Sequence, residues 1–74
     1  MNRQTSEAIA EIHDRIGNQQ LRLRTLRDNC QNAFDTLPEE VHGSSKGMEL
    51  QDGILAMTEA LDALDMAMDS LKGI

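Results

Sequence analysis

Arginine side chains are the residues of this chain best suited to binding a small ligand. The candidate positions are Arg15, Arg22, Arg24 and Arg27. On a helix, their guanidinium groups could hold the phosphate oxygens of a ligand through paired hydrogen bonds. A second interpretation needs no ligand, because Arg22, Arg24 and Arg27 could form ordinary surface ion pairs with Glu59 and Asp62 of a neighbouring helix. Both interpretations are open at this point.

Little else in the sequence suits catalysis or metal binding. Cys30 is the only cysteine and falls in an apolar helical row, where a thiol behaves as a small apolar side chain. His13 and His42 lie far apart, and neither has another His or Cys at ligand spacing. Gly43 and Gly47 do not match the spacing of a phosphate-binding loop. We therefore expect a non-enzymatic protein with no cofactor and no metal.

The charge of the chain argues against DNA as a partner. The formal net charge is −6, and Phe34 is the only aromatic residue apart from the histidines. Nucleic-acid binding needs a positive field, and single strands also need aromatic stacking platforms. Residues 1–36 carry 5 Arg and 5 acids, whereas residues 37–74 carry 2 Lys and 8 acids. This asymmetry favours packing of the two halves against each other.

Apolar residues recur at alternating spacings of three and four in both halves of the chain, which predicts two amphipathic helices. The first row consists of Ile9, Ile12, Ile16, Gln19, Leu23, Leu26, Cys30, Ala33 and Leu37. The second row consists of Leu50, Ile54, Met57, Leu61, Leu64, Met68 and Leu71. Gln19, the polar member, either specifies the packing register or lies in a partly wet region beyond the second helix. The rows predict an all-α protein.

Capping and helix-breaking residues indicate where the helices end. We expect the first helix over residues 5–36, because Thr5 or Ser6 can cap it and Pro38 disfavours helix at the residue before it. A link over 37–46 and a second helix over 47–72 follow, with Ser44 or Ser45 as cap. The short link makes the helices antiparallel, so 1–74 is a single helical-hairpin domain. At Gly17, the first helix either continues or breaks.

A chain this short buries a small core, and oligomerisation is a common remedy. Gly53, Ala60 and Ala67 recur every seven residues beside the second apolar row, where small side chains would let another helix approach closely. Together with Leu55 and Phe34, which lie off the rows, they are the predicted oligomer interface. We expect two or more hairpins to assemble into a helical bundle. The polar first residues and the absence of a long apolar run predict a location in the bacterial cytoplasm, away from membranes.

The segment Leu50–Leu61 resembles the second helix of a family of small phage hairpins. That family includes the anti-CBASS nucleotide sponges and the hairpin part of the anti-Thoeris sponges. The matching residues are Leu50, Gln51, Gly53, Ala56, Thr58 and Ala60. An aromatic residue and an arginine usually precede this helix, and Gly43–Ser45 stands there instead. The resemblance implies a non-catalytic oligomer that sequesters a cyclic oligonucleotide immune signal.

A second segment, Phe34–Glu40, carries a different resemblance. With the glycine-containing link and the Ala-, Met- and Leu-rich helix after it, this segment is similar to the quorum-sensing antiactivators of the TraM type. That resemblance implies a helical dimer that binds a regulatory protein and silences it. Exposed residues such as Leu55 and Met66 would then contact the partner.

Overall fold

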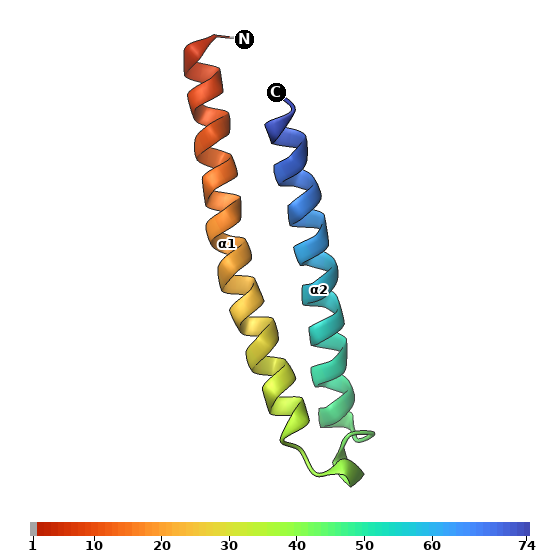
Figure 1. Cartoon of the computed structure of the whole chain (residues 1–74). Coiled ribbons are helices and arrows are strands. Elements are labelled where there is room, and N and C mark those ends of the chain that lie inside the picture. The colour runs from red at the N-terminus through yellow and green to blue at the C-terminus, as the bar shows by residue number, and fades with distance from the viewer. Residues whose placement is uncertain (1) are drawn as a thin grey trace.

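The computed structural model describes residues 2–74, which form an all-α helical hairpin (Figure 1). Its elements are α1 (Arg3–Asp35), the short 3-10 helix η1 (Glu39–Val41) and α2 (Ser45–Lys72). The two long helices run antiparallel side by side, and the start of α1 and the end of α2 lie at the end opposite the link. The molecule measures 58 × 15 × 13 Å, and its radius of gyration is 17.0 Å. A compact domain of this length would have a radius of gyration of about 11 Å, so the hairpin is strongly elongated.

Side chains cap both long helices at their N-termini. The Oδ1 atom of Asn2 accepts a hydrogen bond from the Thr5 backbone N–H at 2.8 Å, so α1 begins before the expected Thr5 or Ser6 cap. The Oγ atom of Ser44, an expected cap, accepts from the Gly47 N–H at 3.3 Å. Each contact satisfies one of the backbone donors that a helix start leaves unpaired. Helix α1 runs without a break through Gly17.

The link is held in place by packing around His42. The ring of His42 stacks on Phe34 with centroids 4.4 Å apart, and its Nε2 atom lies 2.9 Å from the Leu37 carbonyl oxygen. The start of α2 then passes close to the link backbone. A Cβ atom at Gly47 would lie only 2.7 Å from the Val41 carbonyl oxygen. Glycine at this position therefore allows the chain to turn back sharply into α2.

Helix α2 faces α1 with the apolar row that the sequence predicts. All seven residues of that row are buried or half-buried, and Leu61 is only 5% exposed. In α1, however, every second residue of the predicted row is exposed. These exposed residues are Ile12, Gln19, Leu26 and Ala33. The residues that face α2 instead each follow one position later, namely His13, Gln20, Arg27 and Phe34. The predicted packing row of α1 is therefore wrong at alternate positions.

Specific contacts explain why α2 packs on this side of α1. The Nε2 atom of Gln20 donates to the carboxylate of Asp65, and Gln20 is only 8% exposed. Gly17 leaves room for Met68, whose Cε atom would lie 3.4 Å from a Cβ atom placed there. Because α2 occupies this side, Ile12 and Leu26 remain exposed on the other.

Candidate binding faces

The helix pair has two faces that each include residues of both helices, and the first face carries no charge along its centre. Gln19 and Leu26 of α1 and Leu64 of α2 line one groove here, with Arg22 at its margin. Residues at heptad spacing, or one turn away, share a helix face. The first face therefore consists of Ile12, Gln19, Leu26, Ala33, Gly53, Ala60 and Ala67. We call it the uncharged face.

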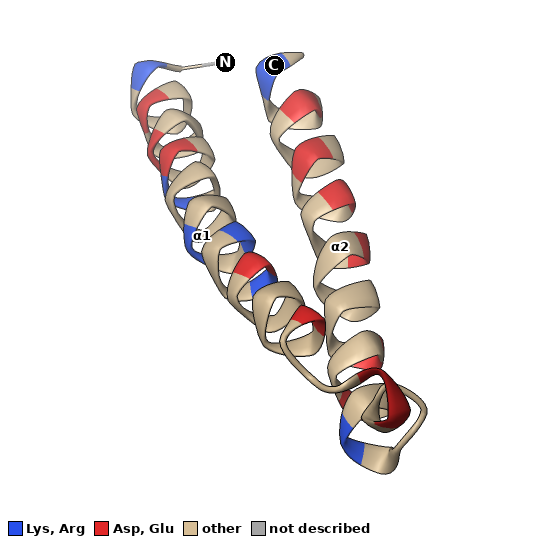
Figure 2. Ribbon diagram, turned by 60° about the horizontal axis from the view of Figure 1, so that its bottom comes forward, with Lys and Arg blue, Asp and Glu red and all other residues tan. Residues whose placement is uncertain are grey.

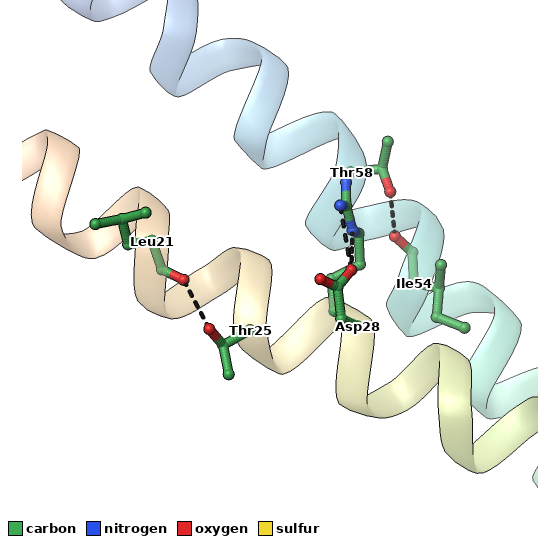
Figure 3. A network of polar contacts seen from close by, with 6 residues as sticks. Leu21, Thr25, Asp28, Ile54 and Thr58 are labelled. Carbon is green, nitrogen blue, oxygen red and sulfur yellow. Dashed lines mark hydrogen bonds and ion pairs between the residues drawn. The ribbon is translucent and has the colours of Figure 1, made fainter.

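The opposite face combines shallow grooves with carboxylates. One groove lies between Asp14, Leu21 and Met68, and a second lies between Phe34 and Leu55. The carboxylates at matching heptad positions are Asp14, Asp28, Asp35, Asp62, Asp65 and Asp69. Together with Leu21 and Leu55, these residues define what we call the acidic face. Figure 3 labels Asp28 on α1 and shows the hydroxyl of Thr58 on α2 donating to the Ile54 carbonyl oxygen.

The charges differ between the two helices as well as between the faces. Figure 2 shows acidic residues recurring along α2, whereas its lysines, Lys46 and Lys72, stand at its ends. All the arginines belong to α1. Within residues 2–74, the ion pairs that form lie inside α1, as between Arg15 and Glu11 at 2.8 Å. The alternative expectation of arginine pairs with Glu59 and Asp62 is therefore not met within one hairpin.

The four arginines predicted to bind a ligand do not converge. Arg15 and Arg22 border the uncharged face, and the Nη1 atom of Arg22 reaches the Gln19 side-chain oxygen at 3.4 Å. Arg24 lies seven residues from Gly17, on the side of the acidic face. Arg27 is half-buried between the helices and pairs with Asp28 at 3.3 Å. One hairpin therefore provides no common phosphate site for all four.

The residues predicted to form the oligomer interface separate onto the two faces. Gly53, Ala60 and Ala67 lie on the uncharged face, whereas Leu55 and Phe34 line a groove of the acidic face. Sequence reasoning missed the exposed Ile12 and Leu26, because it assigned both to the packing row inside the hairpin. The spacing within α1 gave no signal against that assignment, because contacts with α2 such as that of Gln20 with Asp65 decide which side is covered.

The described residues carry no group of three His, Cys, Asp or Glu side chains that could hold a metal ion. Cys30 is half-buried in the row that faces α2. Comparisons of the chain with protein-family models, curated proteins and solved structures found no match. No helix in the described part of the chain is long and apolar enough to cross a membrane.

Proposed function

We propose that this protein is a non-enzymatic binding protein that sequesters a regulatory protein by holding one of its helices on the acidic face. The supporting observation is that exposed leucines and carboxylates occur together on this face. Leu21 and Leu55 are each 59% exposed, and Asp14 and Asp62 lie one heptad from them. A partner helix with an apolar stripe and basic flanks would complement both features.

The spacing of the two grooves fits a helical ligand. One groove includes Leu21 and the other includes Phe34, so they are separated along α1 by about 20 Å at 1.5 Å per residue. A helical segment of roughly thirteen residues covers this distance. Its apolar residues would enter the grooves, while its lysines or arginines would approach the carboxylates. The binding energy would come mainly from the apolar contacts, because exposed ion pairs contribute little.

A cyclic oligonucleotide fits this geometry less well. Its phosphates would be repelled by the carboxylates of the acidic face, and the arginines lie on different sides of the hairpin. Phe34, the one aromatic platform for a base, is already stacked on His42. These observations support the protein partner over the nucleotide signal.

Photo-crosslinking in the cell that makes the protein tests this proposal. A photoreactive amino acid replaces Leu55, and a matched variant carries it at Leu26, which is 56% exposed on the other face. We expect Leu55 to capture a protein through a basic amphipathic helix. The double substitution Asp62→Lys and Asp69→Lys should reduce this capture at least tenfold. Capture that survives the double substitution, or that occurs only from Leu26, would contradict the proposal.

Native mass spectrometry with a panel of cyclic di- and trinucleotides tests the competing nucleotide interpretation. The protein is expected to stay free of nucleotide at every protein and ligand concentration used. A stoichiometric gain of nucleotide mass would replace the protein-partner proposal with the sponge function. Substitution of Arg15 or Arg22 by Glu would then show whether the arginines hold that ligand.

A further inference from the structure

The uncharged face carries large apolar residues that the hairpin does not bury. Ile12 is 50% exposed and Leu26 is 56% exposed, whereas Leu61, at 5% exposed, is the one apolar side chain among residues 2–74 that the hairpin buries. We propose that a second copy of this chain covers the uncharged face, so that two hairpins form a four-helix bundle. This inference concerns a different face from the proposed function and does not depend on it.

The exposed area of the hairpin is consistent with a missing partner of this size. The described hairpin exposes 5547 Å². A compact folded monomer of 8.2 kDa would expose about 4500 Å². The excess of about 1000 Å² is close to the roughly 800 Å² that each partner contributes to a standard interface. One copy stacked on the uncharged face would therefore reduce the exposed area of each chain to about that of a compact folded protein of this mass.

The sizes of the side chains indicate how the two copies would stack. On the uncharged face, α1 presents the large residues Ile12 and Leu26, whereas α2 presents small residues such as Gly53 and Ala60. Large residues pack best against small ones, so α1 of each copy should lie over α2 of its partner. A two-fold axis parallel to the helices produces this arrangement and places both links at the same end.

The contacts within the hairpin give the register across the interface. Gln20 lies level with Asp65, and Gly17 lies level with Met68. Because the helices are antiparallel and the two-fold axis runs along them, each residue keeps its level along the bundle. Leu26 is then level with the partner's Glu59 and lies beside the neighbouring Ala60, which shares the uncharged face. By the same count, Ala33 lies within one residue of the level of the partner's Gly53.

The charges favour the same arrangement. Stacking α2 on α2 would bring two acidic helices together, whereas α1 over α2 places arginines against carboxylates. Arg22 lies level with Ala63, one turn from Glu59. Within its own hairpin, Arg22 has only a long contact to Gln19, at 3.4 Å. Across the dimer, Arg22 would meet the partner's Glu59 at the rim of the interface.

Sedimentation equilibrium of the purified chain tests the interface with two matched substitutions. Leu26→Arg changes the uncharged face, and Leu21→Arg changes the acidic face at a leucine of nearly equal exposure on the same helix. The wild type and Leu21→Arg are expected to have twice the monomer mass of 8.2 kDa. Leu26→Arg should weaken the dimer about a hundredfold, roughly tenfold for each of the two leucines lost. Circular dichroism checks that both variants remain helical.

A charge exchange tests the pairing of α1 with the partner's α2. Arg22→Glu should weaken the dimer, and the added substitution Glu59→Arg should restore it. A monomeric wild type, or a dimer that survives Leu26→Arg but not Leu21→Arg, would overturn the proposed interface. Neither result affects capture of a partner at Leu55, so failure of this inference is distinguishable from failure of the proposed function.

Discussion

The close approach of Gly47 to the link makes a sharp prediction about stability. A Cβ atom at this position would lie 2.7 Å from the Val41 carbonyl oxygen and also too close to the His42 carbonyl. These neighbours are backbone atoms, so relief requires the link to move away from α2. Overpacking of this kind costs about 1–3 kcal/mol, and the better helix propensity of alanine returns at most about 1 kcal/mol. We therefore expect Gly47→Ala to lower the free energy of unfolding by about 1–2 kcal/mol.

Urea denaturation followed by circular dichroism at 222 nm measures this effect, with every variant at the same protein concentration because self-association would shift the midpoint. Gly43→Ala is the matched control. A Cβ atom at Gly43 meets nothing within 4 Å, and its backbone φ is not positive. The control should therefore be neutral or slightly stabilising. If Gly47→Ala were as stable as Gly43→Ala, the backbone of the link would not lie as close to Gly47 as described, and the reasoning would be refuted.

Four further predictions concern the unfolding free energy measured in the same assay. Leu61→Ala should cost about 2–5 kcal/mol because it empties the best-buried apolar site, and a loss below 1 kcal/mol would contradict that burial. Ser44→Ala should cost about 1 kcal/mol through loss of the cap on α2, whereas an unchanged urea midpoint would show that this hydrogen bond does not stabilise the helix. Gln20→Ala should cost about 1–3 kcal/mol because Asp65 loses its donor, and Asp65→Ala should then have little further effect. Gly17→Ala should be neutral or stabilising by up to about 1 kcal/mol, and a clear loss would mean that the helices approach more closely here.

Local patterns predicted the elements well. The alternating apolar rows indicated two helices, and Pro38 with the glycines around it indicated the link. Ser44 was one of the two expected caps, whereas the cap at Asn2 was not expected. Asparagine, serine and threonine are all good caps, so composition alone could not choose among neighbouring candidates near the start of α1.

The choice of packing face could not be predicted from α1 by itself. The row of Ile9, Ile16 and Leu23 has mostly apolar or small residues on one side, with Gln19 as the exception, and His13, Gln20, Arg27 and Phe34 on the other. Because apolar periodicity is the main signal for a packing surface, the sequence favours the more apolar side. Contacts with α2 and the link decide otherwise, because Gln20 meets Asp65 and Phe34 meets His42. Such pairings join residues far apart in the chain, and spacing within one helix carries no information about them.

The candidate binding faces depend on that choice. The sequence contains the carboxylates, arginines and small residues, but their distribution over two faces follows from which side of α1 is covered. With α2 on the Gln20 side, Leu26 joins Ala60 and Ala67 on the uncharged face, and Leu21 joins the carboxylates on the other. The sequence by itself determined that two amphipathic helices form and turn back on each other, because periodicity and capping are local properties. Only the tertiary structure decided which apolar residues remain exposed, because that depends on the rotation of one helix against the other.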